Sequence, residues 1–218
     1  MPSHTTRRGL LGVVAAALLL PGAAIAAKPA PRKLVVLMLG APGSGKTTQA
    51  ERLSRKYKIP AFSMATIFRK ESGWVKDRYK KSLRLPMAAG DVLGDELANQ
   101  LVEKHIRTKK AQNGFILDGY PRTAKQAEYF ERTLSELGLP EPIVIHLDVP
   151  EKVAAKRLLE RGKRQDKPEM VEARMAEYRA EAEFLLRHYQ GRVRRIDGAG
   201  TRDEVWRRVQ QAVEEFLR

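Results

Sequence analysis

The feature that most constrains this chain is a glycine-rich segment that directly follows an apolar run. Residues 40–47 read Gly-Ala-Pro-Gly-Ser-Gly-Lys-Thr and fit the pattern G-x-x-x-x-G-K-[ST]. Residues 33–39, Lys-Leu-Val-Val-Leu-Met-Leu, predict a buried strand before it, and a helix is predicted to begin at about Lys46. This order directs several backbone N–H groups and a helix N-terminus at one anion. The pattern therefore predicts a nucleoside triphosphate site formed by Gly43, Ser44, Gly45, Lys46, Thr47 and Thr48.

The length and charge of the chain limit the class of protein. With 218 residues the chain suits one domain with a sizeable core. Its formal net charge of +15 indicates polyanionic partners, which include nucleotides, nucleic acid and an acidic membrane face. The basic residues are spread along the chain, and six Phe and six Tyr offer few platforms for base stacking. We therefore expect small nucleotides rather than nucleic acid as partners.

The absence of cysteine excludes several kinds of site. A chain with no cysteine has no disulfide, no thiol nucleophile and no cysteine zinc site. The four histidines, His4, His105, His146 and His188, do not have the spacing of metal ligands. His146 lies within a strand-like run, where we expect an ordinary structural histidine. We therefore expect no zinc.

The first 26 residues have the three parts of an export signal. An arginine pair at residues 7–8 precedes an apolar run over residues 9–20, and the small residues that follow include Ala24 and Ala26 at cleavage-site spacing. The arginine pair resembles a twin-arginine signal, which predicts a periplasmic protein with no stable membrane insertion once the signal is cleaved. The alternatives are a retained membrane anchor and a misassigned start, which would leave the protein cytoplasmic.

Strands alternate with helices along the rest of the chain, after a linker at residues 27–32 that two prolines keep extended. Buried strands are predicted at residues 115–118 and 142–149, and a weaker one at residues 192–196. Apolar residues at helical spacing predict helices after the glycine-rich turn, before Gly138 and near the C-terminus, where Thr201 and Glu204 have the spacing of a capping box. This alternation predicts an α/β fold, in which a parallel sheet of about five strands is covered by helices on both faces.

An acid ends one of the predicted strands. Asp118 closes the run Phe-Ile-Leu-Asp, and the sequence Gly-Tyr-Pro-Arg-Thr follows it. A carboxylate at the end of a strand suits a Mg²⁺ ion that accompanies ATP, while the hydroxyl of Thr47 offers a second oxygen. We therefore expect Asp118 and Thr47 to hold Mg²⁺.

Three separated segments together resemble one family of enzymes. They read GAPGSGKTTQ from Gly40, NGFILDGYPRTAKQA from Asn113 and LDVPEKVAAKRLLERGKRQD from Leu147. In this order and spacing they resemble the adenylate kinase family of nucleoside monophosphate kinases, over residues 33–218. The resemblance implies a three-layer P-loop NTPase fold, ATP and a nucleoside monophosphate as partners, and transfer of a phosphoryl group between them.

The resemblance also implies roles for individual residues. The catalytic groups are Lys46, Arg122, Arg161, Arg164 and Arg174. The residues that bind ATP are those of the glycine-rich loop together with Arg157, Arg161 and Gly200. The acceptor side consists of Met64, Arg69, Asp91, Val92, Leu93, Gly119, Tyr120, Pro121, Arg122 and Gln126. Arginines suit this chemistry because two polyanions must be brought together, and the loose transition state needs positive charge more than a base.

Members of this family carry two inserted segments that close over the substrates. Residues 63–93 correspond to the acceptor-binding segment, and residues 162–167 are all that remains for the second segment, the lid. So short a lid implies the branch of the family that has no structural zinc, in agreement with the lack of cysteine. We expect a monomer.

The chain departs from the family pattern where the acceptor base is read. Residues 63–66 are Ser-Met-Ala-Thr where the family usually has Ser-Thr-Gly-Asp, so Met64 puts a thioether in place of a hydroxyl. Gln126 resembles the family residue that reads the acceptor adenine, and it favours the reaction of ATP with AMP to give two ADP. The change at Met64 favours another monophosphate, such as UMP or CMP. A third possibility is an exported nucleotide-binding protein with little turnover.

Overall fold

The computed structural model describes residues 32–73, 94–162 and 166–218. The predicted export signal, most of the predicted linker and residues 74–93 of the predicted acceptor-binding segment lie outside these ranges. The same holds for four predicted site residues, Asp91, Val92, Leu93 and Arg164. Among the helices of the described ranges, none is both long enough and apolar enough to cross a membrane.

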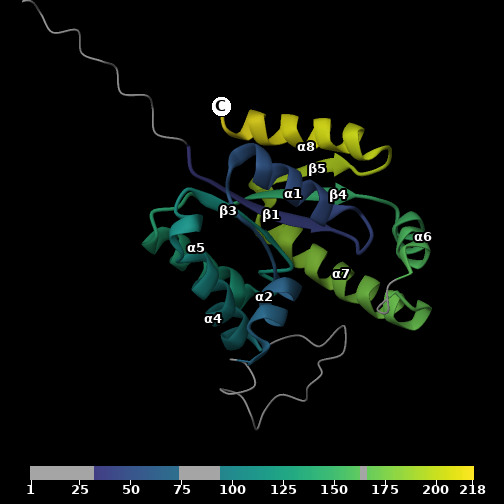
Figure 1. Cartoon of the computed structure of the whole chain (residues 1–218), viewed down its shortest axis with the longest axis horizontal. Coiled ribbons are helices and arrows are strands. Elements are labelled where there is room, and N and C mark those ends of the chain that lie inside the picture. The colour runs from purple at the N-terminus through teal and green to yellow at the C-terminus, as the bar shows by residue number, and fades with distance from the viewer. Residues whose placement is uncertain (1–31, 74–93, 163–165) are drawn as a thin grey trace, which may run out of the picture. The chain divides into compact units, whose positions relative to one another are not determined.

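The core of the protein is a five-stranded sheet (Figure 1). Its strands are β1 (Leu34–Gly40), β2 (Ala61–Ser63), β3 (Gly114–Asp118), β4 (Ile143–Asp148) and β5 (Val193–Asp197). They lie in the order β2-β3-β1-β4-β5, and every neighbouring pair is parallel. The predicted parallel sheet is confirmed, with β1 at its centre. The sequence pattern does not predict β2, because three residues are too few to reveal a strand period.

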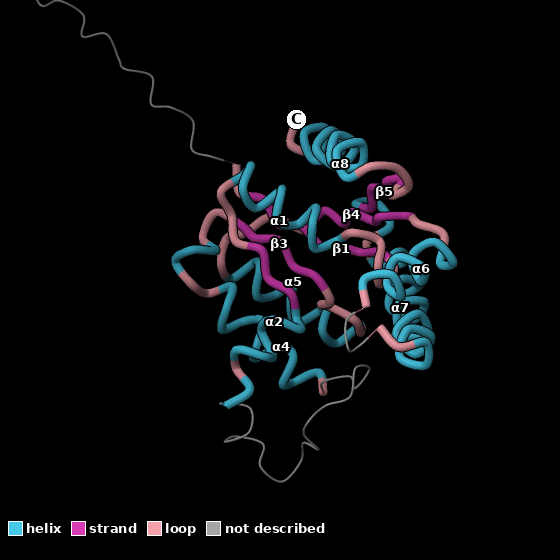
Figure 2. Tube along the Cα trace, turned by 45° about the vertical axis from the view of Figure 1, so that its right-hand side comes forward, coloured by secondary structure: helices cyan, strands magenta, loops and turns pink. Residues whose placement is uncertain are grey.

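Side chains of β1 point alternately to the two faces of the sheet, and each face carries a hydrophobic cluster. Leu34, Val36 and Met38 pack in the cluster that α1 (Lys46–Tyr57) and α8 (Arg202–Phe216) cover. The side chains between them pack in the cluster on the other face. That face is covered by α2 (Met64–Lys70), α4 (Asp95–Ile106), α5 (Ala124–Glu136) and α7 (Pro168–His188). Figure 2 shows the sheet between these two groups of helices, which confirms the predicted three-layer fold.

A third hydrophobic cluster joins the glycine-rich loop to two helices. It contains Ala41 of the loop, Ala154 and Leu158 of α6 (Glu151–Arg161), and Val171 and Met175 of α7. Figure 2 shows α6 and α7 side by side. This packing connects the loop directly to the helices that carry Arg157, Arg161 and Arg174. The short 3₁₀ helices η1 (Lys109–Ala111) and η2 (Gln190–Arg192) complete the chain order.

The ends of the helices agree with the sequence signals. α1 begins at Lys46, and α5 ends at Glu136, shortly before Gly138 adopts a positive φ of 58°. At the start of α8 the Thr201 hydroxyl accepts a hydrogen bond from the backbone N–H of Glu204. In return, the Glu204 carboxylate accepts a hydrogen bond from the backbone N–H of Thr201. The predicted capping box is therefore confirmed.

The sequence pattern does not predict α7. This helix has 21 residues, and its buried residues are few: Val171, Met175, Ala182 and Leu185. An apolar stripe this sparse is masked by the charged residues between its members. The buried His146 of β4 lies against α7, with Nε2 3.0 Å from the Tyr178 hydroxyl, and burial lowers the pKa of its imidazole.

Candidate active site

The glycine-rich loop has the backbone conformation that its sequence predicts. Gly40, Gly43 and Gly45 have φ values of 149°, 89° and 98°. A Cβ atom at Gly43 would lie 2.3 Å from the Ala154 carbonyl oxygen, so a side chain cannot fit between the loop and α6. Gly45 is the N-cap of α1 and supplies no side-chain hydrogen bond to the helix. The first N–H groups of α1 are therefore available to an anion.

Lys46 is folded back over the loop. Its Nζ donates a short hydrogen bond to the Gly40 carbonyl and another, of 3.2 Å, to the Ala41 carbonyl. The ammonium group is thus held where the loop turns around the expected phosphates. Backbone carbonyls are neutral partners, which an anionic phosphate can replace.

The register of the sheet brings Asp118, the predicted metal-binding acid, close to the glycine-rich loop. In the pairing of β1 with β3, Asp118 lies beside Met38 of β1. Asp118 is therefore on the strand next to the one that leads into the glycine-rich loop. Asp118 is half-buried and Thr47 is exposed. Since all strands are parallel, their carboxyl ends share one edge, where ligands of open α/β sheets bind.

The turn after β3 orients Arg122. Gly119 has a φ of 81°, and the Tyr120–Pro121 peptide bond is cis. Nε of Arg122 donates to the Gly119 carbonyl at 3.1 Å. The buried Tyr120 hydroxyl donates to Oδ1 of Asn99 at 2.6 Å, and burial raises the pKa of this phenol. The predicted acceptor-side residues Gly119 to Arg122 therefore form one anchored turn.

Gln126 is held by protein partners at both ends of its amide. Its Oε1 accepts from the backbone N–H of Arg122 at 2.8 Å, and its Nε2 donates to Oδ1 of Asp95 at 3.0 Å. Asp95 also accepts from the Thr123 hydroxyl at 2.9 Å. Gln126 is only 2% exposed, and its amide keeps one N–H and one lone pair beyond these contacts. The sequence reasoning missed Asp95 as a partner of Gln126, because an acid in the first turn of a helix is common for its interaction with the helix dipole alone.

Met64 and Arg69 belong to α2, on the acceptor side. The Ser63 hydroxyl caps this helix by accepting from the Thr66 backbone N–H at 3.2 Å. Met64 is buried, and a Cβ atom placed on Gly119 would lie 3.5 Å from the Cβ of Met64. Arg69 is exposed in the last turn of the helix. Met64 thus packs beside the turn that carries Arg122.

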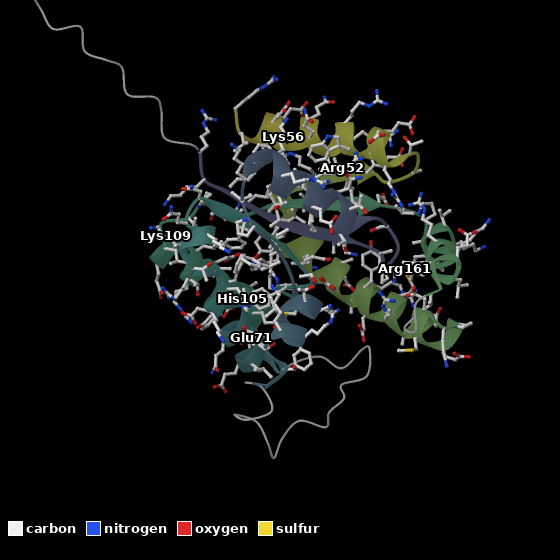
Figure 3. All side chains as sticks on the ribbon, in the orientation of Figure 1. Arg52, Lys56, Glu71, His105, Lys109 and Arg161 are labelled. Atoms are coloured by element: carbon white, nitrogen blue, oxygen red, sulfur yellow. The ribbon has the colours of Figure 1, made fainter. Side chains whose placement is uncertain are left out.

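A buried carboxylate joins two of the predicted arginines on the ATP side. Asp166 accepts from Nε and Nη2 of Arg161 at 2.8 and 2.7 Å, and from Nη1 of Arg174 at 3.1 Å. Its side chain is 0% exposed, and the hydrogen bonds to it raise the pKa of Arg161. Figure 3 labels Arg161 at the end of α6, beside α7. The sequence reasoning missed Asp166 as a site residue, although it ends the third family segment.

The remaining predicted ATP-side residues lie near the turn between β5 and α8. Nη1 of Arg157 is 3.5 Å from the Gly198 carbonyl oxygen, which is the limit of a hydrogen bond. Gly200 has a φ of 107°, and a Cβ there would lie 2.7 Å from the Glu204 carboxylate. The turn therefore requires glycine and leaves its backbone accessible to a ligand.

Comparison with known proteins agrees with this arrangement. The sequence profile of adenylate kinases matches residues 38–194. The chain belongs to the adenylate kinase family. It is 38% identical over 178 residues to an adenylate kinase of Nocardia farcinica, a match covering 82% of this chain and 98% of the relative. It is 37% identical over 180 residues to an adenylate kinase of Mycobacterium tuberculosis strain H37Rv. It is 39% identical over 178 residues to an adenylate kinase of Mycolicibacterium smegmatis, and both matches again cover 82% of this chain and 98% of the relative. The chain is therefore a nucleoside monophosphate kinase, as the resemblance implied.

Proposed function

We propose that this kinase transfers the γ-phosphoryl group of ATP to AMP and releases two ADP. One observation carries the proposal: the loop with Lys46 and the turn with Arg122 follow neighbouring parallel strands, β1 and β3. Donor and acceptor phosphates would meet between them. The relatives described above bear the name adenylate kinase, which supports AMP as the acceptor.

The residues divide between the two nucleotides and the group in transfer. Lys46 would give up its carbonyl partners to the β and γ phosphates, with residues 43–48 around the triphosphate. Arg161 and Arg174, joined by Asp166, would neutralise the oxygens of the moving group, and Arg157 and Gly200 would lie on the ATP side. Arg122 and Arg69 would bind the acceptor phosphate. The bond from the γ phosphorus to the ADP oxygen breaks as the bond to an AMP phosphate oxygen forms.

The oxygen donors near the loop fit a Mg²⁺ ion bound together with ATP. Asp118 and Thr47 offer one carboxylate and one hydroxyl, and Mg²⁺ is usually held by one or two carboxylates with substrate phosphates and waters. Within the described ranges no group of three or more acidic or histidine side chains could hold a metal alone. When bound, the ion would neutralise charge between the β and γ phosphates.

The identity of the acceptor base depends on Gln126 and Met64. The free N–H and lone pair of the Gln126 amide match the edge of adenine, which supports AMP. Met64, which is buried beside Gly119, supports the alternative of UMP or CMP, because a thioether is a weak hydrogen-bond acceptor. A binding protein with little turnover is the remaining alternative.

A coupled assay of ADP formation with AMP, GMP, CMP and UMP tests all three functions. We expect the highest kcat/KM with AMP and a requirement for Mg²⁺. A preference for CMP or UMP would identify the first alternative. Binding of nucleotides without turnover by correctly folded protein would identify the second.

We also propose that the enzyme is exported through the twin-arginine route and acts as a periplasmic monomer. The proposal rests on the arginine pair at residues 7–8, the apolar run and the small residues at Ala24 and Ala26. The test is the N-terminal residue and the cell fraction of the native protein, together with its mass in solution.

A further inference from the structure

The face of α7 that turns toward the active site carries two carboxylates that none of the predicted roles explains. Glu177 and Glu181 are four residues apart and therefore lie on one face of the helix. Oε2 of Glu181 is 3.7 Å from Nε of Arg122, and Oε2 of Glu177 is 3.8 Å from Nη1 of the same guanidinium. Two acids from one helix thus flank a single arginine.

Glu181 occupies an unfavourable place for a carboxylate. Its side chain is 13% exposed, and burial raises its pKa, an effect that Asp118 and Glu177 increase and that Arg122 and Lys46 oppose. Removing a charge from water and placing it beside other acids costs free energy. The favourable interactions of Glu181 are with Arg122 and Lys46, the cations of the phosphate site. The position of Glu181 therefore suggests a role connected with those cations.

The partner common to both acids is Arg122, which the proposed function assigns to the acceptor phosphate. A guanidinium presents its donors in one plane and pairs with a carboxylate or with a phosphate through the same N–H groups. Both carboxylates lie at ion-pair distance from Arg122, whose one Nε–H donates to the Gly119 carbonyl, so a phosphate would be met by the Nη groups of the same guanidinium. A phosphate and the two acids compete for one guanidinium.

We propose that Glu177 and Glu181 are positioning residues that act as internal counter-ions of Arg122 before the acceptor binds and are replaced by the acceptor phosphate. They hold the guanidinium near the position in which it binds the phosphate. They also oppose the negative charge of the incoming nucleotide, so they weaken acceptor binding and favour release of the product. This inference rests on the proposed role of Arg122.

The test compares the isosteric variant Glu181→Gln with two controls. Glu183→Gln removes a carboxylate two residues away that is 72% exposed and paired with Arg187, and Glu181→Asp keeps the charge at the tested position. Binding of AMP and of inorganic phosphate is measured by calorimetry, and kcat and KM are measured separately. In Glu181→Gln we expect Kd and KM for AMP to fall at least about threefold, with kcat changed by less than about threefold. The difference should shrink in high salt. Glu183→Gln should behave as the wild type, and Glu181→Asp should bind AMP more weakly than Glu181→Gln because it keeps the charge.

Two results would overturn the counter-ion role. One is unchanged or weaker binding of AMP by folded Glu181→Gln protein. The other is a large loss of kcat at unchanged Kd, which would assign Glu181 to the transfer step. If this variant does not fold, Glu177→Gln, whose side chain is 27% exposed, should show a smaller change in the same direction. Because the binding measurement needs no turnover, a wild type that transfers no phosphoryl group refutes the proposed function alone, and the variants still decide the counter-ion role.

Discussion

The carboxylate of Asp166 accepts two hydrogen bonds from the guanidinium of Arg161, at 2.8 Å from Nε and 2.7 Å from Nη2. Arg174 donates to the same carboxylate at 3.1 Å. One buried acid therefore fixes the positions of two cations from different helices. Without its charge, the two arginines would repel each other beside the proposed path of the phosphoryl group.

Replacing Asp166 should therefore impair both catalysis and stability. Asp166→Asn removes the charge but keeps the volume, so we expect kcat/KM for ATP to fall about tenfold or more. The melting temperature should also fall, because breaking a buried ion pair leaves uncompensated charge. The matched control is Asp203→Asn, which removes an 80% exposed carboxylate that also pairs with an arginine, Arg52. Equal effects of the two substitutions would show that burial of Asp166 has no functional importance.

Turnover should depend on the two cations at the ends of β1 and β3. Loss of one preorganised charge at the transferring group costs a few kcal/mol, so Lys46→Ala or Arg122→Ala should each reduce kcat by about a hundredfold or more. Lys125→Ala, an exposed change in α5, is the control. Steady-state rates at saturating ATP and AMP measure the effect. Near-normal rates in both variants would rule out the proposed phosphate contacts.

Acceptor choice should respond to Met64 and Gln126 in opposite ways. Met64→Thr restores a hydroxyl, and we expect a higher kcat/KM for AMP. Gln126→Ala removes the amide and should lower kcat/KM for AMP by about tenfold relative to CMP and UMP. Because Gln126 is buried, these ratios are compared below the melting temperature of each variant, with Gln211→Ala on α8 as a control. An unchanged preference in Gln126→Ala would mean that adenine is read elsewhere.

The arginine pair at residues 7–8 should be required for export. Replacing both with lysine keeps the charge and should trap the precursor in the cytoplasm, while the exported wild type should begin at Ala27. Cell fractionation and N-terminal sequencing give the answer. A wild type found wholly in the cytoplasm with residues 1–26 attached would contradict the export proposal and leave the kinase assignment intact.

The contact between Glu103 of α4 and Tyr129 of α5 predicts a pH-dependent contribution to stability. The pKa of Glu103 is lowered, mainly because it accepts a hydrogen bond from the Tyr129 hydroxyl and also one from Arg107. A carboxyl with a lowered native pKa stabilises the fold above its unfolded pKa, and this contribution is lost as the pH falls through the native value. Tyr129→Phe should therefore cost about 1 kcal/mol at pH 7 and less in acid. Denaturant unfolding at pH 7 and pH 3 measures this, and a cost independent of pH would contradict it.

Much of the fold follows from short stretches of sequence. The glycines of residues 40–47 indicate the turn by themselves, and the capping box of α8 lies within Thr201 and Glu204. The apolar runs predict β1, β3, β4 and β5, and parallel pairing then brings the ends of β1 and β3 together. Lys46 and Asp118 are therefore predictable as neighbours, because each motif is local and parallel strands share one carboxyl edge.

The sequence alone thus determined the α/β class, the phosphate-binding loop and the family. Only the tertiary structure decided which charged residues face that loop. Glu177 and Glu181 lie among other acidic and basic residues of α7, and the same pattern would describe a helix face exposed to water. Asp166 likewise gains its role from Arg174 on the next helix. The physical reason is that a charged side chain is stabilised by the groups that lie near it in space. The packing of the helices, which the apolar residues direct, decides which groups those are.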